Sequence, residues 1–303
     1  MGHTFDTLDV FTSRPLAGNP LAVVYEADGL DPGRMQAIAR EFNLSETVFV
    51  MKPENPAHWA RVRIFTPARE LPFAGHPTIG TAVVLAERRL GTSEEHDAIV
   101  TLEEEVGLVR VGVVILPGEV TYAEFDLPKM PEELDAPNDR EAVARAVGLM
   151  GSDIGFDNHR PTNFTAGVPY GFVPVRDPAT LSRAEPVSAL WKSVRFGGTA
   201  MAGAFVYTRA KAGSGHVFAA RMFAPLAGIP EDPATGSAVA AFAGVGERFE
   251  ALGPGRHVVP IEQGADMGRP SEIVLEVEFT GGGISAARIG GSAVRVMEGS
   301  VNL

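Results

Sequence analysis

The sequence contains no cysteine among its 303 residues. Disulfide bonds, thiolate nucleophiles and metal sites that need cysteine ligands are therefore excluded. The seven histidines are scattered along the chain, without the H-x-x-x-H or H-E-x-x-H spacing that marks zinc sites. We therefore expect no metal site.

Long hydrophobic segments and excess positive charge are also missing. Apolar runs such as Val111–Leu116 are far shorter than the ~20 residues of a membrane helix, and the first residues lack the apolar core of a signal peptide. The chain carries 26 Lys and Arg against 38 Asp and Glu, a net charge of −12. Nucleic acid and membrane are therefore not expected as partners, and we predict a cytoplasmic protein.

The chain is long enough for two domains of ordinary size. Residues 31–42 form an amphipathic pattern that Asp31 caps and Pro32 opens, which predicts a helix. The same Asp-Pro pair recurs at Asp177-Pro178 and at Asp232-Pro233. By this reasoning Asp232 is an N-cap, and its presence alone indicates no chemistry.

Two further helical segments, Pro77–Arg88 and Pro233–Gly244, have almost no polar face. A helix that is apolar all round is usually buried on all sides. Strand-like segments such as Thr47–Met51 and Trp59–Phe65 surround them. The predicted fold class is α+β, with two pseudo-symmetric domains that each roll a mixed β-sheet around a central apolar helix.

An internal repeat links these segments. HPTIGTAV begins at His76 and DPATGSAV at Asp232, an offset of 232 − 76 = 156. The strand motif R-x-F-x-P begins at Arg63 and Arg221, an offset of 221 − 63 = 158. Chance similarity between alanine-rich helices is the alternative. A duplicated fold predicts that the two helix N-termini face one another across an interdomain cleft.

The start of each repeated helix suits an anionic ligand. Gly236 and its counterpart allow close approach to the backbone, and unpaired N–H groups with the helix dipole favour a carboxylate. Ser237 and Thr81 add hydroxyls, although a serine inside a helix is usually a packing residue. His76 and Asp232 occupy equivalent positions, where they could pair and exchange protons.

Several segments together resemble the phenazine biosynthesis-like (PhzF-like) family, which has the diaminopimelate epimerase fold. The resemblance is collinear and spans nearly the whole chain. The segments are DVFTSRPLAGNPLAVV (9–24), NLSETVFV (43–50), RIFTPARELPFAGHPTIGTA (63–82), EDPATGSA (231–238) and EQGADMGRPS (262–271). Epimerases of this fold shuttle a proton with two cysteines, a mechanism that this chain cannot use.

The resemblance implies a cofactor-free isomerase, a homodimer, that moves a proton on a small anionic cyclic substrate by acid/base catalysis. It places the catalytic glutamate at Glu46, in the motif S-E-T, with His76 and Asp232 in support and Ser237 in contact with substrate. The isomerase of the family acts on a dihydro-hydroxyanthranilate. From the residues alone, Glu46 is either exposed at the start of a strand or buried, and burial would raise its pKa.

Other residues near these motifs are candidates for the site, although an ordinary structural role would also explain some of them. Ser45 and Gly75 are expected to contact substrate, as is Asn19, although Asn19 also fits a turn. Arg269 could bind an anion or brace an interface, and the sequence does not decide between them. Glu103–Glu105 is interpreted as a solvated strand edge.

We expect one domain from residues 1–118 plus 291–303 and a second from 119–290, with Tyr122–Leu127 opening the second. Two other functions stay open at this point. One is a non-catalytic small-molecule binding protein on the same fold. The other is an epimerase that uses Glu46 together with a base other than cysteine.

Overall fold

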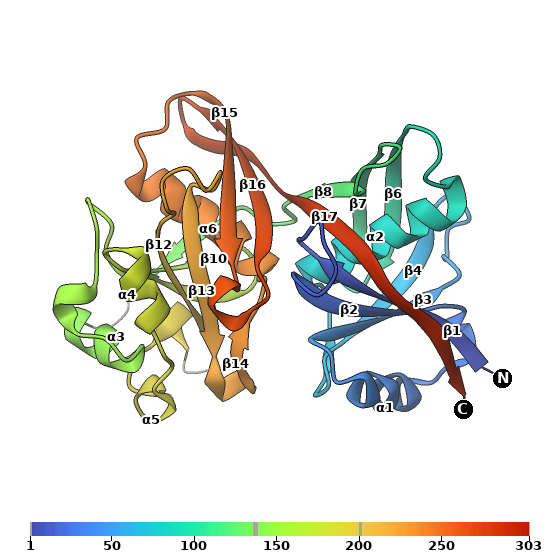
Figure 1. Ribbon diagram of the computed structural model, residues 1–303, viewed down its shortest axis with the longest axis horizontal. Helices are drawn as coiled ribbons and strands as arrows, with labels where there is room; N and C mark the ends of the chain where they lie inside the picture. Colours follow the sequence, from blue (N-terminus) through green and yellow to red (C-terminus); the bar gives the residue numbers. More distant parts are fainter. Residues whose placement is uncertain (1, 136–138, 200–201, 303) are drawn as a thin grey trace. The chain divides into compact units, whose positions relative to one another are not determined.

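The computed structural model describes residues 2–135, 139–199 and 202–302. The chain divides into two compact units, shown in Figure 1. Unit 1 comprises Met1–Asp126 and Gly290–Leu303, and unit 2 comprises Leu127–Ile289. Strand β8 (Tyr122–Asp126) lies in unit 1 because it pairs with β7 (Gly107–Ile115), so it does not open the second domain as the sequence suggested.

Over its described residues, unit 1 is a mixed sheet with two α-helices. Its other strands are β1 (Gly2–Val10), β2 (Asn19–Val24), β3 (Glu46–Met51), β4 (Ala60–Phe65), β5 (Glu70–Leu71) and β6 (His96–Glu104), and its helices are α1 (Pro32–Phe42) and α2 (Gly75–Leu90). The pairs β2–β3 and β4–β6 are parallel, whereas β1–β2, β3–β4, β4–β5 and β6–β7 are antiparallel.

Unit 2 repeats this pairing order. Its strands are β9 (Glu132–Leu134), β10 (Thr162–Thr165), β11 (Pro169–Pro174), β12 (Gly203–Arg209), β13 (Phe218–Ala224), β14 (Ile229–Asp232), β15 (Gly255–Gln263) and β16 (Ser271–Thr280). Its helices are α3 (Arg140–Ala146), α4 (Pro178–Arg183), α5 (Ser188–Trp191) and α6 (Gly236–Phe249). Here β11–β12 and β13–β15 are the parallel pairs. The predicted duplication of one α+β fold is confirmed.

The last strand, β17 (Gly283–Asn302), starts in unit 2 and ends in unit 1, where it pairs antiparallel with β1. Short 3₁₀ turns complete the chain at Ala27–Gly29, Gly151–Asp153, Phe196–Gly198, Pro225–Ala227 and Ala265–Met267. Within the described part of the chain, no helix is both long enough and apolar enough to span a membrane.

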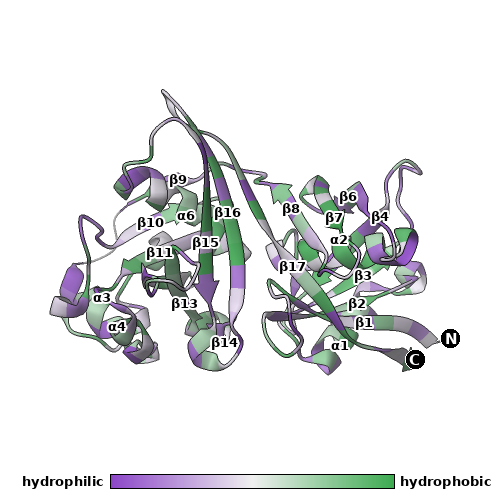
Figure 2. Cartoon of the chain, turned by 45° about the horizontal axis from the view of Figure 1, so that its top comes forward, coloured by the Kyte–Doolittle hydropathy of each residue, from purple (hydrophilic) through white to green (hydrophobic). Residues whose placement is uncertain are grey.

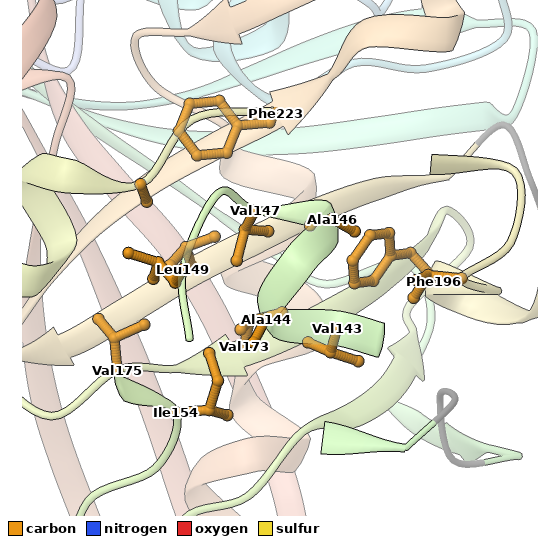
Figure 3. Packing of buried hydrophobic residues seen from close by; sticks show 14 of the residues in the cluster. Val143, Ala144, Ala146, Val147, Leu149, Ile154, Val173, Val175, Phe196 and Phe223 are labelled. Carbon is orange, nitrogen blue, oxygen red and sulfur yellow. The ribbon is translucent and has the colours of Figure 1, made fainter. Parts of the chain in front are cut away.

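The central helices α2 and α6 are buried along most of their length, as their apolar sequences predict. In Figure 2 hydrophobic residues follow the strands of both units. The central helices cover one face of each sheet. Other helices, α1 in unit 1 and α3 in unit 2, pack apolar side chains against the opposite face. Helix α1 packs Met35 and Ile38 with Phe49 of β3. In unit 2, Val143 of α3 and Val147, the residue after that helix, lie in the cluster of Figure 3.

The predicted cap at Asp232 is wrong. Asp31 and Asp177 accept hydrogen bonds from the backbone N–H groups of the third helical residues, as expected of N-caps. Asp232 instead ends β14, where it pairs with Met222 of β13, and the N-cap position of α6 is Thr235. Strand pairing holds Asp232 in β14, three residues before the N-cap that α6 has in the structure.

Candidate functional site

Glu46 is the first residue of β3, and the end of α1 determines where that strand begins. The helix stops at Asn43, which adopts a left-handed conformation with φ 51°. The chain then turns back at once, and Glu46 enters the sheet opposite Leu21 of β2. Its side chain is only 15% exposed, so it is not the solvated glutamate of the alternative interpretation.

His76, the second residue of α2, lies beside Glu46. Its Nε2 atom is 3.2 Å from Oε2 of Glu46, and its side chain is 6% exposed. Burial lowers the pKa of His76 to about 3, and a hydrogen bond to the backbone of Pro20 opposes this shift. Burial prevails, so the imidazole is neutral at pH 7 even though the two groups are at ion-pair distance.

The neutral state assigns the two nitrogens of His76 different roles. Proline has only a carbonyl oxygen to offer, so the Pro20 carbonyl accepts the Nδ1 proton. Nε2 then carries a lone pair that faces the carboxyl oxygen of Glu46. This nitrogen can accept a hydrogen bond from a donor that faces it.

Three other predicted residues adjoin this pair in unit 1. Asn19 is fully buried at the start of β2, directly before Pro20. Ser45 precedes Glu46 in the chain, and Gly75 precedes His76 and is buried as the first residue of α2. The structure therefore gathers the unit 1 candidates around the first turn of α2 and the adjacent ends of β2 and β3.

The unit 2 candidates form their own group at the start of α6. The carboxylate of Asp232 accepts a hydrogen bond from the hydroxyl of Thr235. Buried Gln263 fixes the loop between them: its Oε1 accepts from the backbone N of Thr235 at 3.1 Å, and its Nε2 donates to the Asp232 carbonyl at 2.7 Å. Gln263 was not predicted, although it stands in one of the segments that carry the family resemblance.

Ser237 and Gly236 occupy the first turn of α6. Ser237 is the second residue of the helix, not a residue well inside it, because α6 begins at Gly236. Its hydroxyl lies 2.7 Å from the hydroxyl of Tyr170 on β11. Tyr170 was missed because no local motif connects β11 with α6.

The repeat extends to a pair of arginines that the motif R-x-F-x-P contains. Arg63 makes two bonds of 2.6 Å to Glu70, and Arg221 makes two bonds of 2.8 Å to Glu231. Such bidentate pairs are rigid as well as strong. Each pair fixes the strand that leads into a central helix, β5 in unit 1 and β14 in unit 2.

Glu104 departs from the predicted solvated edge, because it is buried at the end of β6. It lies on the inward face with Val100 and Leu102, which the two-residue period of the strand could have revealed. Burial raises the pKa of Glu104 to about 8. Its Oε1 is 2.8 Å from the hydroxyl of Thr78, a residue of the first turn of α2.

The hydrogen bonds of Thr78 explain how a carboxyl tolerates this position. The hydroxyl has one hydrogen, which it can donate either to the carbonyl of Ala74 or to Oε1 of Glu104, each at 2.8 Å. A bond donated to Glu104 lowers the pKa of this carboxyl, but burial outweighs it. A protonated Glu104 can instead donate to the hydroxyl while the hydroxyl donates to Ala74.

Comparison with known proteins identifies the family. A family model described as "Phenazine biosynthesis-like protein" matches residues 8–299. The chain belongs to this family. The structure of a PhzF-family protein of Bacillus anthracis covers 100% of both chains with a TM-score of 0.89 and 26% sequence identity.

Relatives within the PhzF-like family are named isomerases. An uncharacterized isomerase of Mesorhizobium japonicum is 48% identical over 97% of this chain and 96% of its own length. The trans-2,3-dihydro-3-hydroxyanthranilate isomerase of Pseudomonas aeruginosa is 35% identical over 99% of this chain and 100% of its own. The chain is an isomerase of the PhzF-like family, as the resemblance implied.

Proposed function

We propose that this protein isomerises a small cyclic carboxylate by moving a proton with Glu46, without a cofactor. The observation that carries the proposal is the approach of Nε2 of a neutral, buried His76 to within 3.2 Å of Oε2 of Glu46. When Glu46 holds a proton, as it does midway through the transfer, a neutral imidazole nitrogen at this distance can accept its hydrogen bond.

The reaction needs one carboxylate that works twice. Glu46 removes a proton from one ring carbon, and the electron pair of that C–H bond enters the π system of the substrate. Glu46 is then protonated, and the lone pair on Nε2 of His76 accepts its hydrogen bond. Glu46 returns the proton to a second carbon on the same face, where a new C–H bond forms and the carboxylate is restored.

We further propose that Ser237 and Gly236 contact the substrate and that Asp232 helps to set its charge state. Support comes from the two hydroxyls of Ser237 and Tyr170 beside the first turn of α6 and from the network that orders Asp232. The named substrate of the Pseudomonas aeruginosa relative is a cyclic carboxylate of this class. The predicted interdomain cleft and homodimer stay predictions.

The test is proton exchange with trans-2,3-dihydro-3-hydroxyanthranilate as the probe, followed by NMR in D₂O. General acid/base catalysis typically contributes about 10²–10⁴-fold, so Glu46→Gln should reduce turnover by that factor while the fold persists. The control is Glu95→Gln, a change of the same type at an exposed position of unit 1. Turnover by Glu46→Gln at the wild-type rate would contradict the role of Glu46.

Two outcomes would favour the other functions. Wild-type protein that binds the probe but never exchanges its protons would be a binding protein. Deuterium gained with inversion at a single carbon would indicate an epimerase, since same-face transfer by one carboxylate conserves the configuration.

A further inference from the structure

Unit 2 contains a pocket of about 320 Å³ whose lining includes none of the candidate site residues described above. It lies between the C-terminal half of α6 and the inner face of the sheet. Its lining includes Phe218, Phe242, Gly246, Val259, Leu275 and Val277. Gly246 stands nine residues beyond Ser237 along α6, or ~14 Å at the rise of an α-helix. The pocket is therefore separate from the start of the helix.

The internal repeat shows which side chains unit 2 lacks here. The helix offset of 156 makes Gly246 the counterpart of Leu90 in unit 1. The strand offset of 158 makes Val217 the counterpart of Trp59. Backbone bonds support the second match, since the N–H of Trp59 bonds to Thr101 across β4–β6 and that of Val217 bonds to Pro260 across β13–β15.

Both replacements open space at the pocket. Gly246 and Val217 are lining residues, and a Cβ atom built on Gly246 would meet nothing within 4 Å. Glycine in a helix costs roughly 1 kcal/mol relative to alanine. A glycine that faces empty space in the third turn of α6 gains no packing in return for that cost.

The lining indicates the chemistry of a ligand. Phe218 and Phe242 line the pocket and meet edge to face with ring centroids 5.0 Å apart, so aromatic rings form part of its wall. The charges at the rim are already compensated. His159 and Arg209 bind the carboxylate of Glu250 at 2.9 and 2.8 Å, and Arg256 pairs with Glu276.

We propose that this pocket is a second binding site that takes a small, uncharged aromatic molecule. Its volume lies within the range of ordinary ligand sites, roughly 300–1,000 Å³. Apolar cavities of roughly 150 Å³ in another protein bind benzene. The balanced rim charges favour a neutral ligand over an anion, which distinguishes this site from the one proposed at Glu46.

Indole is the probe, because it is the side chain that unit 1 carries at the matching position. Binding to the full-length protein is measured by calorimetry and by the rise in Tm with indole concentration. Gly246→Leu, which copies Leu90, should weaken indole binding at least tenfold while the variant stays folded. Val217→Trp, which copies Trp59, fills the same pocket from the residue before β13 and should have the same effect.

Two controls locate the binding. Gly29→Leu adds the same side chain at an exposed position of unit 1 with nothing within 4 Å, and it should bind indole like the wild type. Glu46→Gln should also bind indole normally, which separates this site from the proposed catalytic one. No indole binding by the wild type, or equal binding by both pocket variants, would overturn the proposal.

Discussion

Replacement of Glu104 by glutamine should stabilise the protein at neutral pH. The glutamine amide can accept from the Thr78 hydroxyl through its oxygen or donate to it through its nitrogen, but it cannot ionise. Burial raises the pKa of Glu104 from 4.5 to about 8, so between these values the folded state holds a proton that the unfolded state has released. The stability contributed at Glu104 is therefore fully present below pH 4.5 and is lost as pH rises to about 8.

The size of the effect follows from the interval between the unfolded pKa and the assay pH. At pH 7 the unfolded carboxyl is about 2.5 pH units above its pKa, and each unit corresponds to about 1.4 kcal/mol, so Glu104→Gln should gain up to about 3 kcal/mol. At pH 4 the gain should vanish. Urea unfolding of both proteins at pH 4, 6, 7 and 8.5 measures the difference directly.

The control is Glu105→Gln, the exposed neighbour in sequence, which should change stability little at any of these pH values. At each pH the quantity compared is the difference in unfolding free energy between wild type and variant. The contributions of all other titrating groups are the same in both proteins and cancel. A difference between wild type and Glu104→Gln that stays constant from pH 4 to 8.5 would refute the assignment of a buried, protonated carboxyl to Glu104.

Three further changes test other parts of the structure. Arg88→Ala should cost about 3 kcal/mol in urea unfolding, because it removes the cation that contacts the fully buried carboxylate of Asp6 at 2.9 Å; a loss below 0.5 kcal/mol would contradict this pairing. Gln263→Leu should cost about 1–3 kcal/mol in the same assay, because it leaves the backbone N–H of buried Thr235 without its bond. The low pKa of His76 means that the unfolded state gains a proton first as pH falls below 6.5, so stability falls from pH 6.5 towards 3. His76→Gln should lose less stability than the wild type between pH 7 and 4, and identical losses would show that His76 does not drive the effect.

The sequence predicted the fold and one half of the candidate site because their signals are local or repeated. Apolar helices, the duplicated motifs and the cap at Asp31 each need only a short window of sequence. Glu46 and His76 were found through family motifs. Both adjoin β2 in unit 1, since Glu46 pairs with Leu21 and His76 bonds to the backbone of Pro20.

What the sequence did not predict depends on contacts between distant segments. Asp232 looked like a cap because an Asp-Pro pair does not show that the residue is already part of a strand. Glu104 was interpreted as solvated because three acids in a row resemble an exposed edge, whereas strand alternation places only the middle one inside. Gln263 and Tyr170 each contact residues that are 28 or more positions away.

The path of β17 has a consequence for how the chain folds. Residues at opposite ends of the polypeptide are direct neighbours, as in the pair Gly2 and Asn302. During synthesis from the N-terminus, β1 can pair with β2 early, but it can pair with β17 only after the residues between them have been made. Contacts of such long sequence separation slow folding, and the waiting edge of β1 is a surface on which nascent chains could aggregate.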